Sequence, residues 1–369
     1  MTAAIPLIDL TRQQATVGRQ VAMAIARVVA SGQYVLGPEV EAFEREFSAY
    51  LGAGEAIGVD SGTSALQLAL LAAGVGPGDE VITVSHTAVA TVVAIELVGA
   101  RPVLVDIEPG RFTLDPAALG AALTRRTRAI VPVHLYGTPA DLAPILDFAE
   151  RHRLTVIEDC AQAHGARYRA RRVGTWGHLG AFSFYPTKNL GALGDGGAVV
   201  TSDPALGTRV RELRQYGWRQ RYISETRGVN ARLDEIQAAV LRAKLPYLDS
   251  WNARRRQLAA GYRERLAHTD LILPGATPDS EPVYHQFVVR TQSRETLRAS
   301  LAAQAIGSAV HYPALIHQQP AYATLAQTHI ALDRSEQIVA EILSLPIYPA
   351  LTNDELQRIC DTIEASLSA

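Results

Sequence analysis

Lysine and cysteine are both scarce in this chain of 369 residues. Cys160 and Cys360 are the only cysteines, and two cysteines so far apart do not form the disulfide framework of a small secreted protein. We therefore expect two reduced thiols in the protein core. The opening segment MTAAIPLIDLTRQQ has no charged stretch followed by an apolar core, so we expect no secretory signal and a cytoplasmic location of the bacterial type.

An excess of one charge and a long apolar run are also absent. The chain has 35 basic and 37 acidic side chains, a formal net charge of −2, so we expect neither nucleic acid nor a membrane as partner. The apolar run LQLALLAAGVG is interrupted by glycines and by the Pro77–Gly78 turn, and is too short to span a bilayer. No P-loop and no G-x-G-x-x-G fingerprint occurs, which disfavours nucleotide hydrolysis and dinucleotide binding.

Only two of the basic residues are lysines, Lys188 and Lys244. A guanidinium stays protonated, whereas a lysine amine can become a nucleophile or a base, so each lysine is a candidate for chemistry. Lys244 lies in the helical apolar pattern AAVLRAKLPYL, where we expect a solvated or snorkelling side chain. Lys188 lies in no such pattern and is the stronger candidate.

Alternating apolar runs and helical patterns predict an α/β fold with a mostly parallel sheet between helices. The length favours two domains, and 48% hydrophobic residues provide enough material for a buried sheet. Helical patterns such as TSALQLALLAAG and TPADLAPILDFAERH separate the strands. The predicted strands cover residues 55–60, 80–84, 101–106, 129–135, 155–159, 179–184 and 197–201.

The pattern changes after residue 200. Helices are predicted over 204–216, 231–245 and 246–267, and the last two meet at Pro246. A smaller α+β region follows, with YHQFVVR as a strand and with SRETLRASLAAQ and NDELQRICDTIEASL as helices. We therefore predict a large domain of residues 1–249 and a small C-terminal domain of residues 250–369.

The segment AFSFYPTKNLGALGDGGAVV places Lys188 between the end of a predicted strand and a glycine-rich return. Glycines let the backbone turn tightly and approach a bulky ligand. In this position the amine can project into a cleft. The alternative is an ordinary loop lysine.

The segment TVIEDCAQAHGA places Asp159 at the end of an otherwise apolar strand, where open α/β sheets bind ligands. A buried carboxylate needs a partner, and a protonated ring nitrogen is suitable. Gln162 would reach the same ligand if the chain turned into a helix there. The alternative is that Asp159 caps that helix.

The segment VDSGTSALQLAL reads as a strand, a turn and a helix. The N–H groups at the helix start form an anion site, to which the hydroxyls of Thr63 and Ser64 contribute. Such turns also cap helices that bind no ligand, so this signal is weak by itself. No metal site is predicted.

Together with four further segments, these three resemble the DegT/StrS family of nucleotide-sugar aminotransferases, which depend on pyridoxal 5'-phosphate (PLP) and have fold type I. The resemblance covers nearly the whole chain. The further segments are SGQYVLGPEVEAFEREFSAYLG, PVHLYGTPAD, GVNARLDEIQAAVL and LSLPIYPALT.

The resemblance implies a role for individual residues around the cofactor. Lys188 would form the covalent link to PLP and act as the catalytic amine. Asp159 would pair with the pyridine nitrogen, and Gln162 would contact the ring hydroxyl. The residues that would surround the phosphate are Gly62, Thr63, Ser64 and Ser183 of one chain and Asn230 of a second copy. The active unit would then be a homodimer with shared sites.

The resemblance also implies a substrate site and one departure from the family pattern. The residues that match positions near the sugar nucleotide are Tyr185, His311, Tyr312 and His317. Many relatives carry an aromatic residue where this chain has Ala88, and that ring stacks on the cofactor. His86 would supply part of the missing face, or the cofactor would be held less tightly. The alternative is a histidine that is satisfied by hydrogen bonds near a helix start.

The implied reaction moves an amino group from L-glutamate to a keto-sugar carried by a nucleotide. The segment ELRQYGWRQRYISETRGVNARLDEIQAAVLRAKL is more similar to members that aminate C3 of a dTDP-linked 3-keto-6-deoxyhexose than to members that act at C4. Arg219 and Arg221 of this segment would grip the substrate diphosphate, or would be solvated loop charges. A PLP dehydratase is disfavoured because those relatives carry histidine in place of Lys188. A DNA-binding regulator is disfavoured by the even charge.

Overall fold

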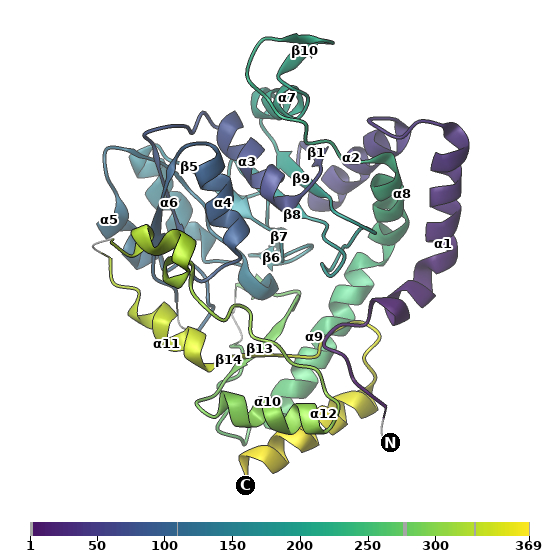
Figure 1. Cartoon of the computed structure of the whole chain (residues 1–369), viewed down its shortest axis with the longest axis vertical. Coiled ribbons are helices and arrows are strands. Elements are labelled where there is room, and N and C mark those ends of the chain that lie inside the picture. The colour runs from purple at the N-terminus through teal and green to yellow at the C-terminus, as the bar shows by residue number, and fades with distance from the viewer. Residues whose placement is uncertain (1–2, 109, 276–278, 328–329, 369) are drawn as a thin grey trace.

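A seven-stranded sheet forms the centre of the molecule, in the order β1-β9-β8-β5-β4-β2-β3 (Figure 1). The computed structural model describes residues 3–108, 110–275, 279–327 and 330–368. Strand β9 runs antiparallel to both neighbours, and the other pairs are parallel. The strands are β1 Glu55–Val59, β2 Glu80–Val84, β3 Arg101–Val105, β4 Thr127–Ile130, β5 Thr155–Asp159, β8 Leu179–Ser183 and β9 Gly197–Thr201.

Both faces of this sheet are apolar, as expected for strands covered by helices on each side. Along β9, Ala198 and Val200 belong to an apolar cluster with residues of α2 and α8. Val199 belongs to a second cluster with residues of α3, α4 and α7. The helices of this part are α1 Leu10–Ser31, α2 Pro38–Leu51, α3 Gly62–Ala72, α4 Val89–Leu97, α5 Leu119–Ala122, α6 Leu142–His152, α7 Pro204–Leu213 and α8 Glu235–Lys244.

All seven predicted strands occur, but the fourth is shorter than its apolar pattern. We predicted residues 129–135, whereas β4 ends at Ile130 and residues 135–137 form a turn of 3-10 helix. Pro132 has no N–H to donate to a neighbouring strand, so the ladder is interrupted there. Val133 keeps only an isolated bridge to Asp159.

A second core lies beyond α8, where α8 and α9 run end to end toward the C-terminal part of the chain (Figure 1). Strands β13 and β14 pair antiparallel there, and α9, α10 and α12 bury their apolar faces against them. The bounds are α9 Leu248–Leu266, β13 Phe287–Arg290, α10 Arg294–Ala303, α11 Asp333–Glu341, β14 Ile342–Leu345 and α12 Asn353–Leu367. The division at residue 249 falls at the start of α9 and stays a prediction.

Short strands connect and extend these parts. β12 (Ser280–Glu281) adds to β6 (Arg167–Tyr168), which pairs with β7 (Arg171–Arg172). β10 (Trp218–Gln220) and β11 (Ile223–Ser224) form a hairpin that projects beyond α7 (Figure 1). None of the described helices is long and apolar enough to cross a membrane.

Candidate active site

A cavity of about 230 Å³ opens at the carboxyl ends of β1, β5 and β8. Ligands of open α/β sheets bind at this edge. The residues that line it are Ser61, Gly62, Thr63, Leu66, Thr87, Ala88, Ala90, Val133, Asp159, Ala161, Gln162, Ser183, Tyr185, Lys188 and Asp195. The structure thus brings Lys188, Asp159, Gln162, Ser183, Gly62 and Thr63 together in one cavity, with Tyr185 half exposed at its border.

Asp159 ends β5, and its carboxylate is buried in the cavity wall. The Ala161 N–H donates to Oδ1 (3.1 Å) and the Thr91 hydroxyl to Oδ2 (2.8 Å). Burial raises the pKa of Asp159, and these two donors and Lys188 oppose that rise. No helix follows, because residues 161–165 turn and the Ala163 N–H donates to the Cys160 carbonyl. Asp159 therefore caps no helix. The sequence reasoning missed Thr91, which lies in the first turn of α4.

The start of α3 approaches β8 closely. Ser61 caps the helix, accepting from the Ser64 N–H (3.1 Å). A Cβ on Gly62 would lie 2.6 Å from the Cβ of Ser183, so only glycine permits this approach. In the described part of the chain we find no acceptor for the N–H groups of Gly62 and Thr63. The Ser61 hydroxyl in turn donates to the Ser64 hydroxyl (3.0 Å), and Ser64 is not part of the lining.

Lys188 follows the strand end in a tight turn, in which its N–H donates to the Tyr185 carbonyl (2.8 Å). Burial lowers the pKa of Lys188 to about 8, against the opposing effect of the Asp159 carboxylate. The amine is therefore neutral in a minor fraction of molecules near physiological pH, a fraction far larger than that of an exposed lysine. In that form it can act as a nucleophile or a base.

The next residue, Asn189, anchors this turn and was missed by the sequence reasoning. Its amide donates to the Asn252 side chain (2.8 Å) and to the Val283 carbonyl (3.0 Å). His285 Nδ1 lies 3.3 Å from Asn189 Oδ1. Burial, and then the charge of Lys188, lower the pKa of His285 well below its usual range, so its ring is neutral. Asn252 and His285 come from the C-terminal half, and no local pattern connects them to Lys188.

Gln162 links the cavity to the predicted substrate residues. Its Oε1 accepts from the Tyr136 N–H (2.6 Å), and its Nε2 donates to the Tyr312 hydroxyl (3.1 Å). The Tyr136 hydroxyl donates to the His311 carbonyl. Tyr312 is thus one hydrogen bond from the lining, and His311 belongs to the same network.

His86 lies outside the lining, whereas Ala88 is part of it. His86 is buried, and its Nε2 lies 2.9 Å from the Tyr136 hydroxyl. Burial lowers the pKa of His86 to about 4. Its contact with the cofactor stays a prediction.

Four further predicted residues lie away from the cavity lining. His317 is buried between the Ser85 hydroxyl (2.7 Å) and Glu336 (3.1 Å). Arg219, on the projecting hairpin, pairs with Glu212 and Glu225. The Arg221 guanidinium lies over the ring of Tyr222 (4.9 Å). Asn230 is exposed at the base of the hairpin.

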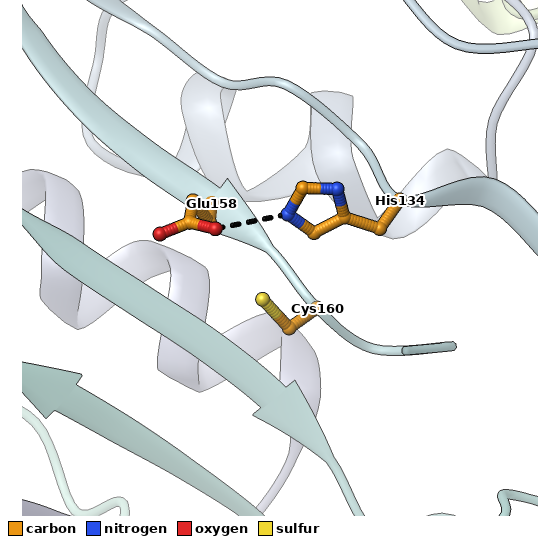
Figure 2. Close-up of side chains that lie close together, drawn as sticks. All are labelled: His134, Glu158 and Cys160. Atoms are coloured by element: carbon orange, nitrogen blue, oxygen red, sulfur yellow. Dashed lines mark hydrogen bonds and ion pairs between the residues drawn. The ribbon is translucent and has the colours of Figure 1, made fainter. Parts of the chain in front are cut away.

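Beside this site, His134, Glu158 and Cys160 lie close enough together to hold a metal ion (Figure 2). Each oxygen of Glu158 already accepts two hydrogen bonds, Oε1 from the N–H groups of Trp176 and Gly177 and Oε2 from Gly174 and His134. His134 Nδ1 accepts from a backbone N–H, so its Nε2 carries the proton that points to Glu158. Burial raises the pKa of Cys160 well above its usual range. Hydrogen bonds therefore account for Glu158 and His134, and those of Glu158 tie the end of β5 to the loop at residues 174–177.

The lining residues fit PLP. The unpaired N–H groups at the start of α3 suit a phosphate, and the close approach at Gly62 adds the Ser183 hydroxyl. The Asp159 carboxylate suits a protonated ring nitrogen, and the Lys188 amine suits an aldehyde carbon.

Comparison with known proteins agrees with this fit. Residues 16–364 match the DegT/DnrJ/EryC1/StrS aminotransferase family. The chain is 51% identical to dTDP-3-amino-3,4,6-trideoxy-alpha-D-glucose transaminase of Streptomyces venezuelae, over 98% of this chain and 96% of that protein. It is 45% identical to dTDP-3-amino-3,6-dideoxy-alpha-D-galactopyranose transaminase of Aneurinibacillus thermoaerophilus, over 97% and 98%.

A solved structure gives the same result. The crystal structure of DesV from S. venezuelae in complex with a ketimine intermediate is similar to this chain with a TM-score of 0.96 and 51% identity, and 99% of each chain is covered. The chain therefore belongs to the DegT/DnrJ/EryC1/StrS aminotransferase family and is a PLP-dependent sugar aminotransferase of fold type I.

Proposed function

We propose that this enzyme transfers the amino group of L-glutamate to C3 of a dTDP-linked 3-keto-6-deoxyhexose. The observation that carries the transamination chemistry is a single cavity that contains an amine, a buried carboxylate and a helix N-terminus. The names of two relatives, each matched over nearly the whole chain, refer to 3-amino sugars linked to dTDP, which supports C3 and the nucleotide.

Asp159 is the proposed partner of the cofactor ring. When bound, PLP supplies an electron sink for the electron pair that remains when a proton leaves the amino-bearing carbon. The Asp159 carboxylate would hold the ring nitrogen in its protonated form. Its two donors, Ala161 N–H and Thr91 hydroxyl, favour the ionised carboxylate and so support this role.

Lys188 is the proposed covalent anchor and proton carrier. Its pKa of about 8 makes the neutral form, which a general base requires, far more accessible than in an exposed lysine. The same amine, once protonated, would return the proton to the neighbouring carbon. L-Glutamate would leave as 2-oxoglutarate, and the sugar ketone would become an amine.

The remaining assignments concern the cofactor phosphate and the sugar nucleotide. Gly62, Thr63 and Ser183 would hold the phosphate, and Gln162 would contact the ring hydroxyl and orient Tyr312 toward the sugar. Tyr185, His311 and His317 would complete the substrate side.

A homodimer would complete each site. Asn230 is exposed and lies outside the lining of its own cavity, which supports a contact with the phosphate in a second copy. Among the described residues no carboxylate pairs with Arg221, whereas Arg219 is paired twice. Arg221 is therefore the better candidate for the substrate diphosphate.

We further infer two domains, residues 1–249 and 250–369, and a cytoplasmic location. The separate apolar core around β13 and β14 supports the division. Cys160 and Cys360 are both buried free thiols, which supports a reducing compartment.

Product analysis tests the proposed substrate. The purified enzyme, loaded with PLP, is incubated with L-glutamate and either the 3-keto or the 4-keto dTDP-6-deoxyhexose, and the aminated carbon is identified by NMR. We expect an amine on C3 of the 3-keto sugar and 2-oxoglutarate in equal amount. Amination at C4 alone would contradict the C3 assignment while leaving the aminotransferase chemistry intact.

A further inference from the structure

The second lysine of the chain, Lys244, is not the solvated side chain that its helical pattern suggested. Its side chain is buried at the end of α8, 7% exposed, and its Nζ donates to the Gly191 carbonyl (2.7 Å). Gly191 follows Lys188 by three residues, in the glycine-rich return. The only two lysines of the protein thus belong to the same loop system, one at its reactive turn and one behind it.

Lys244 is part of a stripe on α8 that faces residues 190–194, the segment called the return below. Gln237, Leu241 and Lys244 are spaced by four and three residues, which places them on one face of a helix. Gln237 Oε1 accepts from the Leu193 N–H (2.9 Å). Leu241 belongs to the same apolar cluster as Leu190 and Ala192. The return is therefore held at two backbone groups and by apolar packing between them.

A displacement of this return would also move the Lys188 turn, because hydrogen bonds connect the two ends of the loop. The Ala192 N–H donates to the Phe184 carbonyl (2.8 Å), and the Phe184 N–H donates to the Gly196 carbonyl (2.7 Å). A Cβ on Gly191 would lie 2.3 Å from the Pro186 carbonyl oxygen, so the two ends of the lysine turn touch. Pro186 and Gly191 flank Lys188 in the sequence and lie in contact, so we expect a shift of Gly191 to move the Lys188 turn.

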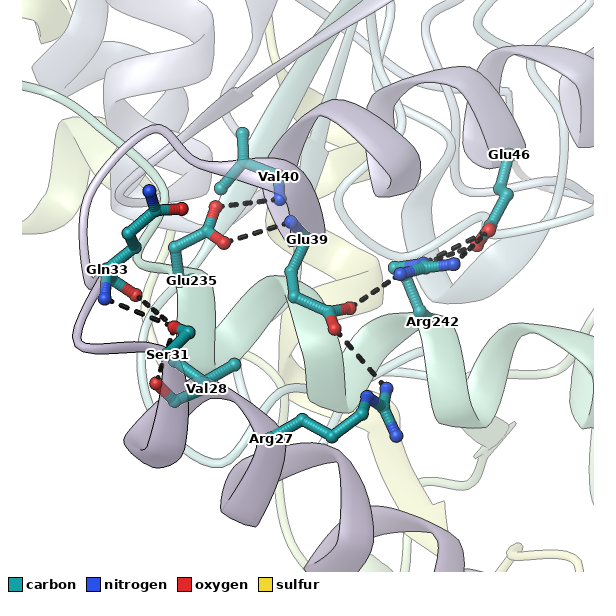
Figure 3. Close-up of polar contacts among 9 residues, drawn as sticks. All are labelled: Arg27, Val28, Ser31, Gln33, Glu39, Val40, Glu46, Glu235 and Arg242. Carbon is teal, nitrogen blue, oxygen red and sulfur yellow. Dashed lines mark hydrogen bonds and ion pairs between the residues drawn. The ribbon is translucent and has the colours of Figure 1, made fainter.

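Helix α8 is itself fixed on its other side (Figure 3). Glu235 is buried and accepts from the N–H groups of Gly37, Glu39 and Val40. Gly37, the N-cap residue of α2, has no side chain to accept these bonds, so Glu235 caps the helix instead. Arg242 pairs with Glu39 and Glu46 of α2. These contacts make α8 a stable support for the side chains that hold the return.

We propose that Gln237 and Lys244 are positioning residues that hold the 190–194 return from behind and thereby fix the Lys188 amine for proton transfer. This inference rests on the proposed role of Lys188. Neither residue lines the cavity or touches the reacting atoms.

A purely structural role explains Lys244 poorly. Burying an amine costs free energy unless it is hydrogen-bonded, and burial lowers the pKa of Lys244 to about 8. A methionine would fill the same space without that cost. Arginine serves at every other basic position of the chain apart from Lys188, so the amine here is best explained by its bond to Gly191.

Four variants separate positioning from general stability. Lys244→Met and Gln237→Leu each remove one hydrogen bond to the return while keeping similar volume. Gln237→Glu keeps an acceptor for the Leu193 N–H and is the conservative partner of Gln237→Leu. Arg242→Met is the matched control, because it removes a cation from the same helix on the side that faces α2.

Three readouts are needed, two of which do not depend on turnover. In PLP-free protein, we expect faster hydrogen exchange of residues 184–196 in Lys244→Met and Gln237→Leu, but not in Gln237→Glu or Arg242→Met. In PLP-loaded protein, the pH titration of the visible cofactor absorbance should shift in the same two variants. Their single-turnover rate with L-glutamate should fall about 10- to 100-fold, because a small misplacement of a reacting group lowers the rate by about this factor. The apparent affinity of the enzyme for L-glutamate should change little.

Borohydride reduction of the PLP-loaded protein, followed by peptide mapping, separates this inference from the one it rests on. One outcome would overturn the positioning role alone. In it the label is on Lys188, but hydrogen exchange, the pH titration of the absorbance and the single-turnover rate are unchanged in Lys244→Met and Gln237→Leu. Wild-type label away from Lys188 would overturn the role of Lys188 and, with it, the inference. Equal losses in Arg242→Met would also overturn the inference, since α8 would then act only through stability.

Discussion

At the scale of single residues, burial shifts the pKa values of Lys188 and Asp159 in opposite directions. It lowers the pKa of Lys188 to about 8 and raises that of Asp159. Both shifts favour the neutral forms, and the attraction between the two groups opposes both. The reactivity of the amine is therefore set by the balance between burial and one nearby carboxylate.

This balance predicts the pH dependence of PLP capture. The neutral amine attacks the aldehyde, so in PLP-free protein the capture rate should rise with pH and level off above about 8, well below the range of an exposed lysine. Stopped-flow absorbance measures the rate. Lys188→Ala is the control and should fold normally, bind PLP without the visible lysine-linked band and show no transamination. A rate that keeps rising to pH 10 would contradict the lowered pKa.

Asp159→Asn should shift the same profile toward acid. The Asp159 carboxylate raises the pKa of Lys188, so its removal should lower that pKa further. Transamination by this variant should nevertheless slow by orders of magnitude, because an amide would no longer keep the ring nitrogen protonated. An unchanged single-turnover rate with L-glutamate would remove Asp159 from the mechanism.

The hydrogen bond from Thr91 leads to a prediction about the pKa of Asp159 itself. The Thr91 hydroxyl donates to the carboxylate and lowers the pKa of Asp159, so Thr91→Val should raise that pKa further. If ionised Asp159 is required, the acid limb of kcat/KM moves to higher pH by the same amount. Thr91→Ser keeps the hydroxyl and should retain the wild-type profile. Identical limbs in all three proteins would show that the bond has no catalytic effect.

Residue types and their local patterns predicted part of the site, but not the residues that hold the site residues in place. Lys188 and Asp159 lie at or just after strand ends, a position that a local pattern reveals, and Gln162 follows Asp159 by three residues. Ser183 was implied only by the family resemblance, and the structure gathers all four in one cavity. Thr91 and Asn252 reach the site only through the fold. A threonine or an asparagine inside a helix gives no local signal of such a contact.

At the scale of elements, the start of α3 sets how closely a phosphate can approach β8. Gly62→Ala would place a Cβ 2.6 Å from the Cβ of Ser183, and the helix start must move away. We expect PLP to bind at least about tenfold more weakly, because the N–H groups and the hydroxyl no longer converge. Fluorescence titration measures the affinity. Gly120→Ala, where a Cβ would meet nothing within 4 Å, is the matched control and should bind PLP normally.

Periodicity predicted the strands of the central sheet because they are short apolar runs bounded by turns. The prediction for 129–135 was wrong beyond Ile130, since an apolar run does not reveal which backbone groups Pro132 leaves unpaired. Helices α1, α2 and α4 were not predicted separately, and the β10–β11 hairpin was read only as a polar loop. The cap that Glu235 places on α2 joins residues almost 200 positions apart and is invisible to any local pattern.

At the scale of the whole molecule, one chain contains most but not all of the predicted site. Asn230 and the hairpin with Arg219 and Arg221 lie away from the cavity of their own chain. If they serve the cavity of a second copy, each site needs Lys188 of one chain and Asn230 of the other. A shared site of this kind can be tested by mixing inactive chains.

We therefore predict that activity reappears when Lys188→Ala and Asn230→Ala chains are refolded together. In the mixed dimer one site carries both defects and the other carries neither, so random pairing should restore about a quarter of the wild-type activity. The Asn230→Ala chain alone must first be shown to be nearly inactive, and tags on the two chains must show that mixed dimers have formed. If the sites were not shared, every site would keep one defect and mixing would restore nothing. The fraction recovered therefore distinguishes a shared site from two independent ones without any assumption about which sugar is aminated.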